Sequence, residues 1–65
     1  MKTKVIAKIK NDEQEWEEPF ILAGEVSADE MSEYICNLCE LYNSYLKPNE
    51  TPRELVGIKS LEVIP

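Results

Sequence analysis

The sequence has no histidine, one arginine, two glycines and two cysteines among its 65 residues. Without histidine or a glycine-rich loop, it lacks most of the groups from which enzymes build general bases, phosphate sites and oxyanion holes. It has no apolar run long enough to cross a membrane, and its alternating, lysine-bearing first ten residues lack the apolar centre of a signal peptide. The sequence therefore predicts a cytoplasmic protein that is not an enzyme, binds no cofactor and does not enter a membrane.

The composition predicts a single folded domain that spans residues 1–65. Apolar residues make up 43% of the chain, which is too many for a disordered protein. At this length, burial of apolar surface only just offsets the entropy that the chain loses on folding. Stabilisation by a partner is therefore compatible with the sequence.

Acidic residues outnumber basic ones, and the two kinds are separated along the chain. The net charge is −6, with four lysines in residues 1–10 and nine acidic but no basic residues in residues 11–33. A nucleic-acid-binding surface needs clustered lysine and arginine to displace counterions from phosphates. Nucleic acid is therefore not an expected ligand.

The segment from Ser27 to Leu46 is predicted to be the only helix. Ser27 and Glu30 have the spacing of a capping box, and Pro48 follows the predicted end because proline disfavours a continued helix. Apolar residues recur at spacings of three and four, which places them on one face. That face comprises Met31, Tyr34, Ile35, Leu38, Leu41, Tyr42 and Tyr45.

Three other segments have the pattern of strands. Residues 3–10 and 15–23 alternate between apolar and polar side chains, and the polar residues between them suit a hairpin loop. The lysines of the first strand are expected to oppose Glu15 and Glu17 on the solvent face. Residues 54–64 are rich in Val, Ile and Leu, but their alternation slips, which predicts either a bulge near Lys59 and Ser60 or a strand that breaks and restarts.

These elements predict an α+β fold with the order ββαβ, in which one helix covers one face of a three-stranded antiparallel sheet. Pro19 cannot donate a ladder hydrogen bond, so the second strand belongs at an edge and the expected strand order is 2-1-3. The core then combines one face of the sheet with the apolar face of the helix. Its predicted members are Val5, Ala7, Ile9, Phe20, Leu22, Met31, Tyr34, Ile35, Leu38, Leu41, Tyr42, Tyr45 and Ile58, with Trp16 a candidate for one end.

Cys36 and Cys39 form the one pattern that is typical of redox or metal chemistry. A redox pair needs its first cysteine at a helix N-terminus, where the dipole lowers the thiol pKa, but both cysteines lie in the middle of the predicted helix. A zinc site needs four ligands, so two thiols without histidine would have to be shared between two copies. We therefore expect two reduced, structural cysteines and no metal site, with Cys39 beside the apolar face and Cys36 nearer to solvent.

The candidate partner-binding residues lie in and beside the hairpin loop. Asp12, Glu13, Glu15 and Glu17 belong to an acidic segment whose hairpin tip and helix start are expected to form one negative surface that docks on a basic groove. Trp16 is either a hot spot for a partner at a sheet edge or an apolar residue that closes one end of the core. The alternative for the acidic residues is a role in solubility and helix capping alone.

The segment after the helix carries a resemblance. Asn43, Leu46, Pro48, Glu50, Pro52 and Arg53 form the run N-x-x-L-x-P-x-E-x-P-R, which resembles a segment of small uncharacterised proteins encoded by bacteriophages and prophages. The resemblance implies a phage accessory protein that acts on a host or defence component, and it supplies no activity or site. From the residues themselves, Asn43 is expected to hydrogen-bond the backbone near the helix end, and Arg53 to pair with Glu50 or a helix carboxylate.

Two functional hypotheses follow from the sequence. In the first, a non-catalytic accessory protein binds a basic protein partner through its acidic surface. In the second, the protein is a structural domain that forms a homodimer through a sheet edge or through Trp16.

Overall fold

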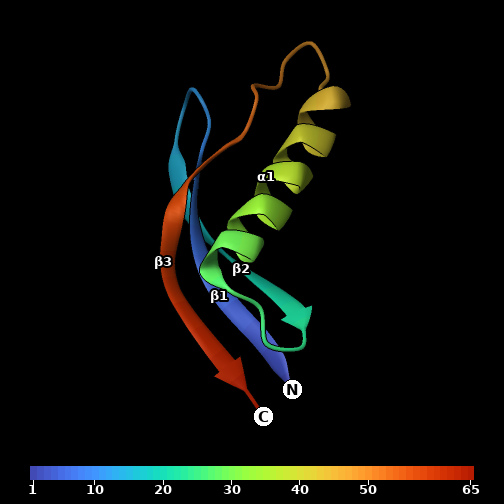
Figure 1. Cartoon of the computed structure of the whole chain (residues 1–65). Coiled ribbons are helices and arrows are strands. Elements are labelled where there is room, and N and C mark those ends of the chain that lie inside the picture. Colours follow the sequence, from blue (N-terminus) through green and yellow to red (C-terminus); the bar gives the residue numbers. More distant parts are fainter.

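The sheet is built from three antiparallel strands. Strands β1 (Lys2–Lys10) and β2 (Glu15–Ala23) form a hairpin, and β3 (Glu54–Ile64) pairs with the other edge of β1. The strand order is therefore β2-β1-β3, as Figure 1 shows in the computed structural model of residues 1–65. This order confirms the prediction made from Pro19, which lies in an edge strand.

Asn11 shapes the loop that joins β1 to β2. Its side-chain oxygen accepts hydrogen bonds from the backbone N–H groups of Glu13 and Gln14, both at 2.8 Å. Its own N–H donates to the carbonyl of Gln14 at 2.9 Å. Asparagine suits this position because its short side chain can replace a backbone acceptor in a turn.

Two bulges interrupt the pairing of β3 with β1. The first leaves Lys59 without a partner on β1, and the second leaves Val56 without one. The predicted bulge near Lys59 is confirmed, the alternative of a broken strand is wrong, and the bulge at Val56 was not predicted. Each bulge reverses the side of the sheet that the following residues face. Apolar residues at both odd and even positions of β3 therefore lie on the helix side of the sheet. These residues are Leu55, Ile58, Leu61 and Val63.

Helix α1 (Ala28–Ser44) begins as the sequence predicts. The backbone N–H of Glu30 donates to the Ser27 hydroxyl at 3.2 Å, and that hydroxyl donates to the Glu30 carboxylate at 3.3 Å. The helix ends two residues before the predicted Leu46, with Tyr45 as its C-cap. The N–H of Tyr45 bonds the carbonyl three residues earlier at 3.1 Å, which tightens the last turn and stops the helix.

A buried threonine ties the start of the helix to the sheet. The hydroxyl of Thr3 donates to the Gly24 carbonyl at 2.7 Å and accepts from the N–H of Val26 at 2.9 Å. Gly24 has φ +85°, a conformation that residues with a side chain rarely adopt, so glycine permits the sharp turn here. Thr3 thereby provides hydrogen-bond partners for two backbone groups of the segment that leads from β2 into α1.

The core lies between β1 and α1. Its buried apolar residues are Val5, Ala7 and Ile9 from β1 and Met31, Ile35 and Cys39 from α1. Residues that pack against this cluster while partly exposed are Trp16, Phe20, Leu22, Val26, Tyr34, Leu55 and Ile58. Most of the predicted core is therefore confirmed.

Two members of the predicted core are wrong. Leu41 is 56% exposed and Tyr45 is 78% exposed. At about 100° per residue, Leu41 lies about 120° around the helix from Ile35, the centre of the buried face. Tyr45 lies beyond the last helical residue. The buried face is therefore turned toward Cys39, which lies within the core as a small apolar residue.

The face of the sheet away from α1 carries exposed ion pairs. Lys8 contacts Glu15 at 3.1 Å, and Lys59 of β3 contacts Glu17 at 2.6 Å. The expected opposition of lysines to these glutamates is confirmed by the register, in which Lys8 faces Glu17 and Lys10 faces Glu15. Exposed pairs of this kind each contribute about 0–1 kcal/mol. No helix in this chain combines the length and the apolar character that a membrane span requires.

Candidate functional site

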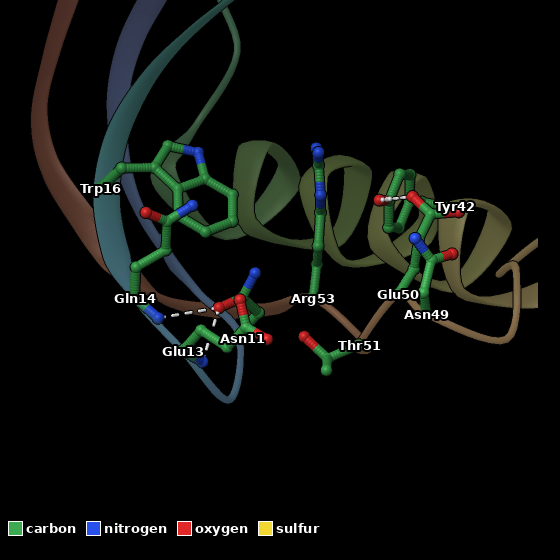
Figure 2. A pocket seen from close by; sticks show the side chains of 9 residues that line it. All are labelled: Asn11, Glu13, Gln14, Trp16, Tyr42, Asn49, Glu50, Thr51 and Arg53. Atoms are coloured by element: carbon green, nitrogen blue, oxygen red, sulfur yellow. Dashed lines mark hydrogen bonds between the residues drawn. The ribbon is translucent and has the colours of Figure 1, made fainter.

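A cleft of about 450 Å³ lies at the hairpin end of the molecule, between the β1–β2 loop and the connector of residues 45–53. Figure 2 shows the side chains that border it, which come from the hairpin, the last turns of α1 and the connector. The lining residues are Asn11, Glu13, Gln14, Trp16, Tyr42, Asn49, Glu50, Thr51 and Arg53. Most of them are polar or charged, and two are aromatic.

Asn43 fixes the connector against α1. Its side-chain amide donates to the carbonyl of Arg53 at 3.0 Å, and its side-chain oxygen accepts from the Arg53 backbone N–H at 2.7 Å. This pair of bonds resembles one rung of a strand ladder, and it ties the start of β3 to the last turns of the helix. The prediction that Asn43 bonds backbone is confirmed, although its partner lies ten residues downstream.

Glu50 is held in the cleft by two hydrogen bonds. It accepts from the Tyr42 hydroxyl at 2.8 Å, drawn in Figure 2, and from the Lys47 backbone N–H at 3.0 Å. The bond from the Tyr42 hydroxyl, followed by the bond from Lys47, lowers the pKa of the Glu50 carboxyl below its ordinary value. Glu50 is therefore a fixed negative charge at neutral pH, and it forms no ion pair.

Arg53 stands between two aromatic rings. The carbon of its guanidinium lies 3.9 Å from the centre of the Tyr42 ring and 5.3 Å from the centre of the Trp16 ring. Figure 2 shows the side chain rising between the two rings. The predicted pairing of Arg53 with Glu50 or a helix carboxylate is wrong, because no carboxylate lies within ion-pair distance. The rings attract the cation through their negative faces instead.

Trp16 closes one end of the core as well as bordering the cleft. It packs against the buried cluster, and its indole N–H donates to the Glu18 carboxylate at 3.1 Å. A smaller, mainly apolar groove of about 190 Å³ adjoins the cleft and shares Tyr42 and Arg53 with it. The remaining residues of that groove are Ile9, Glu18, Phe20, Leu38 and Cys39. Trp16 is therefore not a freely exposed hot spot.

The structure divides the predicted partner-binding residues between two faces. Glu13 and Trp16 line the cleft, and Asp12 is exposed at the loop tip without lining it. Glu15 and Glu17 carry ion pairs on the face away from α1. The cause is the alternation of β2, which points neighbours of Trp16 to the opposite side of the sheet.

The single negative surface expected from the hairpin tip and the helix start does not form. The loop tip follows the pairing of Lys10 with Glu15, and the helix start follows the pairing of Lys2 with Ala23 at the other end of the hairpin. Nine paired residues separate these ends, or about 26 Å of strand. Figure 1 shows the helix start at the opposite end from the hairpin loop. The acidic segment therefore forms two separate negative regions.

Seven of the nine residues that line the cleft were not predicted as site residues, and Tyr42, Glu50 and Arg53 are among them. Tyr42 was assigned to the core, and Arg53 was expected only to pair with Glu50 or a helix carboxylate. The sequence offers one signal for these residues. The only arginine of the chain, Arg53, follows a few residues after the two tyrosines at the end of the helix, Tyr42 and Tyr45. Their convergence depends on contacts between the connector, the helix and the hairpin, which periodicity does not encode.

The two cysteines are free and differ in environment. Cys36 is exposed and Cys39 is buried. Burial, followed by the neighbouring Cys36, raises the pKa of the Cys39 thiol above its ordinary value. No group of three or more His, Cys, Asp or Glu side chains is gathered as a metal site would require.

The cleft combines charged, polar and aromatic groups. Glu13 and Glu50 contribute two negative charges and Arg53 one positive charge, so the lining is left with a net charge of −1. Its amide and hydroxyl groups supply oxygen acceptors, and its two aromatic rings supply apolar surface. In comparisons with known proteins, no family model, no curated protein and no solved structure matches this chain. The phage resemblance stays a prediction.

Proposed function

We propose that this protein is a small, non-catalytic binding protein whose hairpin-end cleft docks on a basic protein and takes up one lysine or arginine side chain. The resemblance of residues 43–53 to phage-encoded segments extends the proposal to a host or defence component as the partner. The observation that carries the proposal is the net charge of −1 in a cleft whose only cation, Arg53, is stacked between aromatic rings.

The two carboxylates belong to opposite sides of the cleft. Glu13 lies in the hairpin loop, and Glu50 lies in the connector, where its two hydrogen bonds hold it. One incoming ammonium or guanidinium neutralises the remaining charge. Its methylene stem packs on the parts of the Trp16 and Tyr42 rings that Arg53 leaves uncovered, since both residues are only partly buried.

The charge of the whole chain supports the same partner. At a net charge of −6, the protein attracts basic surfaces over distances of about one Debye length, near 10 Å in 0.1 M salt. Such attraction accelerates encounter, and the cleft supplies the specific contact. Binding is therefore expected to weaken as the salt concentration rises.

The test uses a blocked trilysine peptide and the indole N–H signal of Trp16, the only tryptophan of the chain. The peptide is expected to shift this NMR signal with a dissociation constant on the order of millimolar, because each exposed contact contributes under about 1 kcal/mol. The variant E13Q/E50Q removes both cleft carboxylates and is expected to weaken binding by about tenfold. Glutamine at position 50 keeps an oxygen that accepts from the Tyr42 hydroxyl.

The matched control is E15Q/E17Q, which removes the same number of charges from the face away from α1. This control is expected to bind the peptide within about twofold of the unaltered protein. If both double variants weaken peptide binding equally, the affinity depends only on the net charge of the protein. Equal retention by both would show that the cleft is not the site.

A further inference from the structure

Cys36 and Cys39 line the same open hollow, which lies where α1 meets the start of β3. The hollow has a volume of about 290 Å³, and Leu55 of β3 is among its other lining residues. Cys36 is exposed, and Cys39 keeps 9% of its surface exposed although it belongs to the core. A small ion that enters this hollow can therefore contact both thiols.

The helix fixes the separation of the two thiols. Side chains three residues apart on a helix are neighbours, with Cβ atoms about 5–6 Å apart. A disulfide needs Cβ atoms about 3.5–4.5 Å apart, so this pair cannot form one without distortion of the helix. Both cysteines are free in the structure. Their sulfur atoms are therefore available together as ligands.

Two thiols at this spacing suit copper(I) better than a metal that needs more ligands. Structural zinc takes four ligands, and no third His, Cys, Asp or Glu side chain is gathered with the pair. Copper(I) is a soft cation that prefers thiolates, and two of them in a linear arrangement complete its coordination. At about 2.3 Å for each metal–sulfur bond, that arrangement places the two sulfur atoms about 4.6 Å apart. Cysteines whose Cβ atoms are about 5–6 Å apart reach this separation when each sulfur leans slightly toward the other.

Charged residues around the pair leave the hollow negative. Glu40, Arg53 and Glu54 line it together with the two cysteines, which gives a net charge of −1 while the thiols are protonated. Glu54 contacts Lys10 at 3.7 Å, whereas Glu40 forms no ion pair. The hollow therefore attracts a small cation, and the unpaired carboxylate that acts on it is that of Glu40.

The two cysteines also influence each other electrostatically. Burial, followed by the neighbouring Cys36, raises the pKa of the Cys39 thiol, and the positive charge of Arg53 opposes this rise. Two thiolates this close repel each other, so without a cation the pair does not ionise together at neutral pH. A cation bound between the two sulfur atoms removes the repulsion and stabilises both thiolates.

We propose that Cys36 and Cys39 bind one copper(I) ion per chain as a linear pair of thiolate ligands. Each thiol releases its proton to water, and the ion forms one bond to each sulfur, so no oxidant or reductant takes part in the step. The site goes beyond the proposed binding of a basic partner, because the hollow shares only Arg53 with the hairpin-end cleft. Either proposal can therefore fail without the other.

The experiment is a competition for copper(I) between the protein and the chelator bicinchoninate, followed by the absorbance of the chelate, without oxygen and with ascorbate to keep the copper reduced. The unaltered chain is expected to take one copper ion per chain, and X-ray absorption is expected to show two sulfur neighbours. The variants C36A and C39A each leave one thiol and are expected to weaken binding by about 100-fold or more. Because Cys36 is exposed, C36A gives this test without a change in the core.

The matched control is C36N/N37C, which exchanges two exposed neighbours of α1 and leaves the composition unchanged. A thiol at position 37 lies two residues from Cys39, and side chains at that spacing do not face each other on a helix. This variant is expected to weaken binding by about tenfold or more. Equal affinity of C36N/N37C and the unaltered chain overturns the proposal, because any two thiols would then suffice. One copper ion for every two chains also overturns it, and so does an affinity of C36A equal to that of the unaltered chain.

Discussion

Arg53 is held by two aromatic rings rather than by a carboxylate. Arginine suits this position because its planar guanidinium stacks on rings, whereas the compact ammonium of lysine does not. Tyr42 has two roles here, since its ring contacts Arg53 and its hydroxyl donates to Glu50. One helix residue therefore positions both a cation and an anion of the cleft.

The ionisation of Glu50 predicts a pH dependence of stability. Its pKa is lowered in the folded state, chiefly by the hydrogen bond from the Tyr42 hydroxyl, so the folded state favours the charged form. This contribution is fully present above the ordinary pKa of about 4.5 and is lost as the pH falls through the lower folded value. We expect E50Q to lose less stability between pH 6 and pH 3 than the unaltered chain, in urea unfolding followed by circular dichroism.

The control for this comparison is E40Q. Glu40 is an exposed glutamate of α1 outside the cleft, so its replacement removes the same charge without touching Tyr42. Its pH profile is expected to follow that of the unaltered chain. A profile of E50Q that runs parallel to that of E40Q would contradict the role of the Tyr42 bond.

At the scale of elements, the connector depends on one asparagine. Replacing Asn43 with alanine removes both bonds to the Arg53 backbone, which is only partly exposed to water. We expect N43A to lower the free energy of unfolding by about 1–2 kcal/mol, because two backbone groups lose their partner. The measurement is urea unfolding, with N37A as the matched control, since Asn37 is an exposed asparagine of the same helix.

The position of Asn43 also predicts a local effect. Without its bonds, Arg53 is released from its place between the rings, and the indole N–H signal of Trp16 is expected to shift in N43A and not in N37A. Equal unfolding free energies for the two variants, or an unchanged Trp16 signal in N43A, would show that the connector is fixed by other contacts.

The arrangement of elements could be predicted from local rules. Alternation located the hairpin, the capping pair Ser27 and Glu30 located the helix start, and Pro19 decided the strand order. The predicted core failed at Leu41 and Tyr45 because a broad apolar stripe does not determine which of its sides faces the sheet. That choice depends on how Thr3 and the turn at Gly24 orient the helix.

The cleft could be predicted only in part. Glu13 and Trp16 were recognised from the charge and aromatic pattern of the hairpin. The separation of Glu15 and Glu17 from Trp16 follows from strand alternation and was available in the sequence. The contribution of Glu50 and Arg53 was not available, because it depends on a side chain of α1 that bonds the backbone ten residues later.

At the scale of the whole molecule, shape separates the acidic residues into two regions. The chain measures 42 × 19 × 15 Å along its principal axes, and the hairpin loop and the helix start lie at opposite ends of the hairpin. At physiological ionic strength the Debye length is about 8 Å, so salt screens the charges at one end of the molecule from a partner bound at the other end. The position of a charge along the molecule should therefore matter more than the net charge.

This separation predicts how capture of a basic partner depends on charge position. The variants D12N/E13Q at the hairpin end and D29N/E33Q at the helix start have the same net charge, and both leave the Ser27–Glu30 cap intact. The unaltered chain, used as bait in a bacterial lysate, is expected to retain a basic partner in about 0.1 M salt and lose it near 1 M, where the Debye length is about 3 Å. D12N/E13Q should lose that partner already at the lower salt, and D29N/E33Q should keep it, as quantified by mass spectrometry. Equal loss with both variants would mean that net charge alone governs capture, and retention with D12N/E13Q would place the contact away from the hairpin end.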